Sequence, residues 1–148
     1  MYRLVLLTFI TLGFIGCEKK VKFDLKDASE LLTVDATIEN GQDPIVILTK
    51  SLNYFSKITV DVLAQSLIKD ADVYISDGIK THKLKRFDIT LPGNIPFSIY
   101  SSDPLDPATV IKGEQGKTYQ LKILWKGTEY SSVTTIPQLR KTIDSIWW

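Results

Sequence analysis

Short segments in which apolar and polar residues alternate constrain the fold of this chain more than any other feature. Alternation with a period of two places the apolar side chains on one face of a β-strand. The clearest apolar set is Tyr119, Leu121, Ile123 and Trp125. Lys126-Gly127 then predicts a tight turn into a second strand, Glu129 to Ile136. We expect Ile123 and Trp125 to lie buried on the inner face of this hairpin.

Two further hairpins are predicted by the same combination of alternation and turn residues. They are Leu31 to Ile38 with Ile45 to Leu48 across Asn40-Gly41, and Ala71 to Ser76 with Lys80 to Phe87 across Asp77-Gly78. In the first strand the alternation predicts that Leu32, Val34, Ala36 and Ile38 face a core. In the second hairpin it places Val73 and Ile75 on one face.

Two segments are less regular. Between Leu52 and Ile68 the residues Ile58 to Val62 look like a strand, whereas Val62 to Leu67 is compatible with one helical turn, so we expect a long loop or an edge. The segment from Leu91 to Pro107 contains four of the six prolines. Because proline donates no backbone hydrogen bond, any strand in that segment is expected to be short or at a sheet edge.

About seven short strands without a long helix predict an all-β fold. The expected architecture is an antiparallel β-sandwich, Ig-like or transthyretin-like, formed by one domain over residues 31–137. A hydrophobic fraction of 44% and a charged fraction of 24% are typical of a globular domain with one core.

The first seventeen residues predict export and lipidation. Arg3 precedes an apolar run, Leu4 to Ile15, which is shorter than the roughly 20 residues that a membrane-spanning helix needs and is typical of a secretory signal. Phe14-Ile15-Gly16-Cys17 resembles the lipobox of bacterial lipoproteins, in which the cysteine sulfur accepts a diacylglycerol. We therefore expect residues 1–16 to be a signal peptide, Cys17 to carry the lipid, and residues 17–30 to be a solvated tether.

Charge and cysteine content exclude several classes of site. Removal of residues 1–16 takes away one of the 18 basic residues and none of the 17 acidic ones, and a neutral domain without a basic stripe argues against a nucleic-acid partner. The single cysteine, Cys17, rules out an internal disulfide or a thiolate metal cage. We expect no metal and no cofactor. The basic run from Lys80 to Arg86 is interpreted as a solvated strand face.

No residues in the sequence assemble into a convincing active site, so we expect a non-catalytic protein. The single histidine, His82, is placed within a strand, where a surface or cross-strand role is favoured over proton transfer. The acid pairs Asp70/Asp72 and Asp103/Asp106 are interpreted as turn formers rather than as metal ligands or a glycosidase pair. Asn53, Tyr54 and Phe55 lie in the irregular segment and are the candidate contact residues for a partner or a ligand, with core filling as the alternative.

Several stretches together resemble the Bacteroidota outer-membrane lipoprotein family called domain of unknown function 4249. They are Cys17-Glu18-Lys19 with Asp24-Leu25, Leu31 to Ile38, Lys50 to Phe55, Ala71 to Gly78, Gly116 to Leu121, and Gly127 to Tyr130 continuing through Ile136-Pro137. The resemblance implies an outer-membrane lipoprotein that is an accessory to a TonB-dependent transporter, on either the periplasmic or the cell-surface face. It implies no catalytic residues.

Family members usually continue beyond the Ile-Pro step into a second β-rich region. Residues 138–148, which end in Trp147-Trp148, are therefore expected to be the start of a second domain that is missing here. Three functions follow from the sequence: an interaction module at a transporter, a glycan- or peptide-binding surface module, and a non-functional truncated copy.

Overall fold

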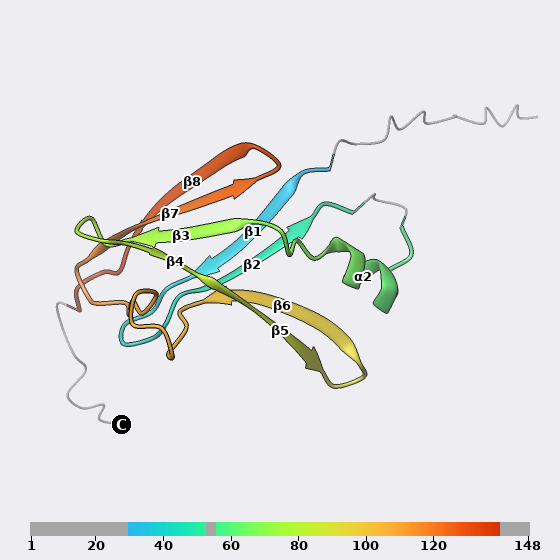
Figure 1. The fold of residues 1–148 in the computed structure, drawn as a ribbon, viewed down its shortest axis with the longest axis horizontal. Coiled ribbons are helices and arrows are strands. Elements are labelled where there is room, and N and C mark those ends of the chain that lie inside the picture. The colour runs from blue at the N-terminus through green and yellow to red at the C-terminus, as the bar shows by residue number, and fades with distance from the viewer. Residues whose placement is uncertain (1–29, 53–55, 140–148) are drawn as a thin grey trace, which may run out of the picture.

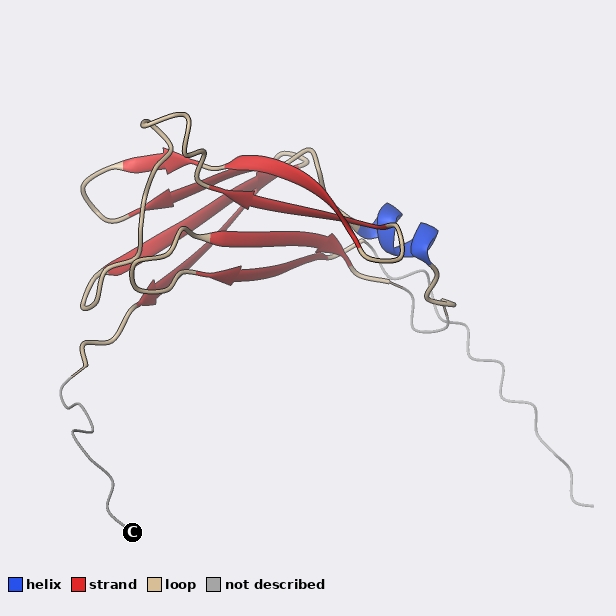
Figure 2. Cartoon of the chain, turned by 90° about the horizontal axis from the view of Figure 1, so that it is seen from below, coloured by secondary structure: helices blue, strands red, loops and turns tan. Residues whose placement is uncertain are grey.

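Two four-stranded antiparallel sheets pack face to face in the computed structural model, which describes residues 30–52 and 56–139 (Figures 1 and 2). Their strand orders are β1-β2-β6-β5 and β4-β3-β7-β8. The elements are β1 (Leu32–Thr37), β2 (Ile45–Lys50), α2 (Val60–Ser66), β3 (Asp72–Ser76), β4 (Thr81–Lys83), β5 (Lys85–Leu91), β6 (Ile95–Ser101), β7 (Thr118–Trp125) and β8 (Thr128–Thr135). The predicted all-β sandwich is thus confirmed, and no described helix is long and apolar enough to cross a membrane.

The predicted hairpins form at glycine-containing turns. Gly41 and Gly78 take positive φ angles of 76° and 86° in the connections β1–β2 and β3–β4. Between β7 and β8, Lys126 and Gly127 take φ of 49° and 78°, which is the arrangement of a two-residue type I′ turn. β7 and β8 then pair along their full length, from Thr118 opposite Thr135 to Trp125 opposite Thr128.

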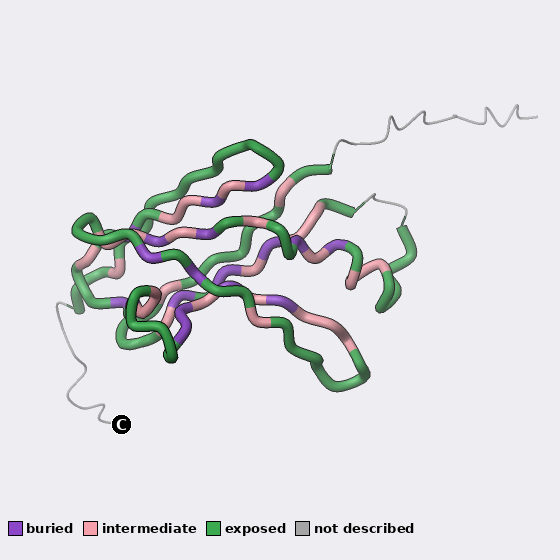
Figure 3. The backbone as a smooth tube through the Cα atoms, viewed as in Figure 1, coloured by how far each residue is buried: buried purple, intermediate pink, exposed green. Residues whose placement is uncertain are grey.

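The core lies between the two sheets and uses the alternate residues that the sequence marks. Tyr119, Ile123 and Trp125 are buried from β7, with Val73 and Ile75 beside them from β3. β2 supplies Val46 and Leu48 from the opposite sheet. The predicted burial of Ile123 and Trp125 is confirmed, because these residues are 2% and 4% exposed. Figure 3 shows the buried positions alternating along these strands.

The segment from Lys80 to Phe87, predicted as one strand, is divided between the two sheets. β4 pairs with β3, whereas β5 pairs with β6 in the other sheet. Leu84 lies at the crossing and is 4% exposed, so the chain passes from one sheet to the other over a buried side chain. This division accounts for eight described strands in place of about seven.

The prediction of a loop or edge between Leu52 and Ile68 is wrong in part, because α2 forms there. The Thr59 side chain caps the helix by accepting a hydrogen bond from the Val62 amide at 3.3 Å. Ser66 is buried, whereas Ile58, the first residue of the apparent strand, is 74% exposed. The cap and the contact of α2 with β6 therefore determine the local structure, although the β-branched residues of this segment favour a strand.

A strand that contains a proline lies inside a sheet, although any strand between Leu91 and Pro107 was expected to be short or at a sheet edge. β6 contains Pro96 and is placed between β2 and β5. However, β2 pairs with β6 at Val46 opposite Tyr100, near the other end of β6, whereas Pro96 is paired with Thr90 of β5. Pro96 thus has a paired strand on one side alone, so this part of β6 is equivalent to a sheet edge, where proline is tolerated.

β1 is an edge strand whose inner face is half covered, although its alternation predicts a buried face. Leu32 and Ile38 pack against the core, while Val34 is 39% exposed and Ala36 is exposed. On the other sheet, every residue of β8 is exposed. Both edge strands lie on the same side of the sandwich, where Glu30, just before β1, pairs with Lys126 of the β7–β8 turn at 2.8 Å.

Candidate functional site

A polar groove lies between the β4–β5 crossing and the loop from Ser102 to Thr109, and we call it the loop groove. Its volume is about 660 Å³. The residues that line it are Lys80, Thr81, Lys83, Leu84, Lys85, Asp103, Asp106, Ala108 and Thr109. The β3–β4 turn and the loop that border the groove lie at the end of the sandwich opposite the start of β1 (Figure 1).

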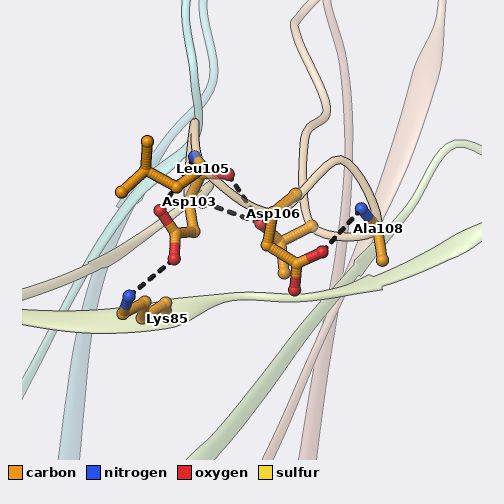
Figure 4. A network of polar contacts seen from close by, with 6 residues as sticks. Lys85, Asp103, Leu105, Asp106 and Ala108 are labelled. Atoms are coloured by element: carbon orange, nitrogen blue, oxygen red, sulfur yellow. Dashed lines mark hydrogen bonds and ion pairs between the residues drawn. The ribbon is translucent and has the colours of Figure 1, made fainter.

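Asp103 organises the loop beside the groove (Figure 4). One carboxylate oxygen accepts from the Lys85 ammonium at 2.6 Å, and the other accepts from the Leu105 amide at 3.1 Å. These two donors hold the pKa of Asp103 below its usual range, with the Lys85 bond as the larger cause. Asp103 is 7% exposed, so a charged group is fixed at the base of the loop by an ion pair from β5.

The remaining loop contacts are local. The Asp106 carboxylate accepts from the Ala108 amide at 3.0 Å, and the Thr109 hydroxyl accepts from the Asp103 amide at 2.8 Å. A bond from an aspartate side chain to the amide two residues later is the Asx turn. The interpretation of Asp103 and Asp106 as turn formers is therefore confirmed.

The other acid pair also has structural partners. Asp70 accepts from the indole Nε1 of Trp125 at 3.1 Å, and Asp72 pairs with Lys83 at 2.6 Å. Within the described residues no three His, Cys, Asp or Glu side chains are grouped in a way that could hold a metal ion. The carboxylates of both acid pairs are thus engaged in contacts within the fold.

His82 lies in β4 opposite Ile75 and is 7% exposed. Its Nδ1 is 3.1 Å from the Ala108 carbonyl oxygen, which ties β4 to the loop. The predicted cross-strand role is confirmed, and the alternative surface role is wrong. The basic run around it faces solvent as expected, since Lys80, Lys83, Lys85 and Arg86 are exposed.

Apolar side chains are exposed to solvent at both ends of the sandwich. At the loop-groove end, Ile79 is 90% exposed in the β3–β4 turn and Leu105 is 89% exposed at the tip of the loop. At the entry end, Leu31 and Leu52 are 60% and 41% exposed. Single exposed apolar side chains are common on protein surfaces and do not by themselves mark a binding site.

A second, smaller cavity of about 70 Å³ opens between the edge strands β1 and β8. We call it the side cavity. It is lined by Ala36, Thr37, Ile38, Pro44, Val46, Ile75, Tyr119, Leu121, Ser132 and Thr134. Its lining is mostly apolar because it is the margin of the core itself.

The residues that the sequence nominates for lipidation and contact are Cys17, Asn53, Tyr54 and Phe55, and all four lie outside the described residues. The loop groove and the side cavity were not predicted. Their lining residues come from segments far apart in the chain, and the pairing of Lys85 with Asp103 leaves no signature in the spacing of those residues.

Comparison with known proteins gives one match. No curated protein and no solved structure matches the chain. The model of the family described as domain of unknown function (DUF4249) matches residues 18–148, which is most of the chain and begins directly after Cys17. The chain therefore belongs to the DUF4249 family.

Proposed function

We propose that this protein is a membrane-anchored, non-catalytic lipoprotein and an accessory to a TonB-dependent outer-membrane transporter. The observation that carries the proposal is the short apolar run that ends in Gly16-Cys17, directly before the first residue matched by the family. A lipid on Cys17 would hold the protein at a membrane, because two or more acyl chains anchor a protein firmly.

The orientation of the sandwich supports a role in contact with a partner. β1 begins at the end of the sandwich opposite the loop that borders the groove (Figure 1). A domain anchored through that end presents the loop groove, Ile79 and Leu105 away from the bilayer. The ion pair that holds Asp103 favours binding over acid–base chemistry at the groove.

Metabolic labelling with a fatty-acid analogue tests the anchor. The substitution Cys17→Ala should abolish labelling, whereas Lys19→Ala, which keeps the thiol, should be labelled like the parent. Undiminished label in Cys17→Ala would refute the lipoprotein assignment. Co-purification of the detergent-solubilised protein with a large β-barrel receptor tests the second half of the proposal, and recovery of the labelled protein without a receptor would refute the accessory role.

The volume of the loop groove favours one alternative, a glycan- or peptide-binding surface module. That function predicts saturable binding of a glycan or peptide by the purified lipoprotein in the absence of any receptor. Lys80→Ala, which removes a side chain that lines the groove, should weaken such binding, while Leu139→Ser, at an exposed residue outside the groove, should leave it unchanged. Binding that is equal in both variants would exclude the groove as its location.

A further inference from the structure

The sheet β1-β2-β6-β5 carries apolar side chains on the face that points away from the core. In β6, Ser98 and Tyr100 are buried and face inward. Successive side chains of a strand point to opposite faces, so the residues next to them in β6 point outward. The outward-pointing apolar set, which we call the outer face, is Ile95, Phe97 and Ile99 of β6, Phe87, Ile89 and Leu91 of β5, and Ile45 and Ile47 of β2.

The polarity of the β5–β6 hairpin is the reverse of that expected for a sheet with one solvated face. Arg86 and Asp88 of β5 face inward, where Asp88 accepts a hydrogen bond from buried Ser98 at 2.8 Å. The outward-facing residues Ile89 and Leu91 are 42% and 38% exposed. An antiparallel sheet normally presents polar residues on its solvated face. The composition of the outer face is therefore typical of a surface that packs against another layer.

The width of the outer face requires more than one strand to cover it. Its apolar side chains come from three adjacent strands, which span about 14 Å at a strand spacing of about 4.8 Å. One extended segment, whether a partner peptide or residues 140–148, would cover about a third of that width. A second sheet that packs face to face at a distance of about 10 Å would cover all of it.

The charges at the two margins of the outer face are opposite in sign. The described strands of this sheet place two charged side chains on this face, Asp35 on β1 and Lys85 on β5. A hollow of about 480 Å³ lies beside β1 at one end of the face, and Glu39 and Asp43 also line it. One margin is thus acidic and the other carries a lysine, which is the arrangement that a self-complementary interface needs.

We propose that the outer face is the interface of a homodimer, in which two copies pack sheet against sheet about a two-fold axis parallel to the strands. This axis places β1 of one copy over β5 of the other, so Asp35 lies beside Lys85 of the second copy. Lys85 donates to Asp103 at 2.6 Å within its own chain, and an ammonium group has further donors for Asp35. An axis across the strands would instead bring the two copies of Asp35 together.

The point at which the chain enters the sandwich favours the same axis. A two-fold axis parallel to the strands puts the start of β1 at the same end in both copies (Figure 1). The lipids on both copies of Cys17 then reach one bilayer, and neither tether has to run back along the sandwich. This step rests on the proposed lipid anchor, whereas the width and the charges of the outer face do not.

Cysteine cross-linking in intact cells tests the interface. Two copies with different tags are co-expressed, one with Thr33→Cys on the outward side of β1 and the other with Ile89→Cys on β5. A bismaleimide that spans about 10 Å matches the separation of packed sheets. We expect a link between the two tags. In the matched control, Thr33→Cys is paired with Ser131→Cys on the far sheet and should give no link.

Two further substitutions test the apolar and the charged contacts separately. Ile45→Asp places a carboxylate within the interface and should lower the yield of the Thr33–Ile89 link by about tenfold or more. Ile79→Asp, at an exposed isoleucine in the β3–β4 turn, should leave the yield unchanged. Asp35→Lys should also lower the yield, because it places a lysine beside Lys85 of the second copy. Melting temperatures close to that of the parent show that the variants fold.

The outcomes separate this inference from the proposed function. Absence of a Thr33–Ile89 link, or equal yields for the parent, Ile45→Asp and Asp35→Lys, would overturn the dimer. A link between two copies of Thr33 in place of the Thr33–Ile89 link would overturn the assigned axis. A Thr33–Ile89 link in protein that takes up no fatty-acid label would uphold the dimer and refute the proposed anchor.

Discussion

Replacement of Trp125 tests whether the last hairpin is the centre of the core. Trp125 is 4% exposed at the end of β7, and its Nε1 donates to Asp70 at 3.1 Å. Truncation of a buried Trp to Ala typically costs roughly 3 to 5 kcal/mol through lost burial and the cavity that remains. Domains of this size are stable by about 5 to 15 kcal/mol, so Trp125→Ala removes a large part of the free energy of unfolding.

The magnitude translates into a clear thermal shift. With about 4 °C or more of melting temperature per kcal/mol, Trp125→Ala should melt at least about 12 °C below the parent. Trp125→Phe keeps the aromatic body and loses the bond to Asp70, so its cost should be about 1 kcal/mol. Far-UV circular dichroism is the suitable assay, because Trp147 and Trp148 would contribute to fluorescence. Val133→Ala, on the solvent face of β8, is the control.

A melting temperature for Trp125→Ala within a degree or two of the parent would refute the register of β7. The opposite register would place Lys122 and Leu124 inside and Ile123 outside. In that arrangement Ile123→Ala would also be nearly silent, whereas the observed register predicts a cost of roughly 2 to 5 kcal/mol. The two substitutions together therefore distinguish the two registers.

Three further outcomes are expected. Tyr100→Phe should cost about 1 to 3 kcal/mol in urea unfolding, because the buried hydroxyl donates to the Ile68 carbonyl at 3.1 Å and leaves it unpaired when removed. The pKa of Asp103 is lowered in the folded protein, so its contribution to stability is present above the unfolded pKa of about 4. This contribution is lost as the pH falls through the lower folded pKa. Asp103→Asn should therefore flatten the acid side of a plot of urea midpoint against pH. Gly113→Ala should lower the melting temperature, since a Cβ at this position would lie 2.2 Å from the Glu39 carbonyl oxygen, whereas Ser131→Ala on the exposed edge should not.

The elements that were predicted correctly are those whose signal is local. The three hairpins follow from alternation and from turn residues such as Lys126-Gly127, because both depend on neighbours in the chain. Alternation also identifies the buried residues of β7, since a strand with one face against a core has a period of two.

The errors arise where contacts distant in sequence decide the structure. Leu84 gives no signal that the chain changes sheets there, because its burial depends on both layers. The strand-like residues before α2 are overridden by the Thr59 cap and the contact with β6. Alternation in β1 correctly indicates which residues face inward, but how far they are covered depends on what lies beside the edge.

The candidate sites were beyond sequence reasoning for the same reason. The loop groove depends on an ion pair between residues 18 positions apart, and the side cavity combines β1 with β8 from the two ends of the domain. Turn formation by Asp103 and Asp106 was predictable because an Asx turn closes over two residues. The placement of Asp103 against Lys85 was not predictable.

The positions at which the chain enters and leaves the sandwich determine how the domain would respond to mechanical load. The chain enters β1 at one end of the sandwich and leaves β8 at the other (Figure 1). Tension between the tether and the segment beyond Leu139 would therefore run parallel to the strands. β1 is held to β2 over six residue pairs and β8 to β7 over eight. A pull along the strands loads all of these backbone bonds together, whereas a pull across them would open one pair at a time. A domain anchored at its N-terminus and pulled from its far end would thus resist extension by shear.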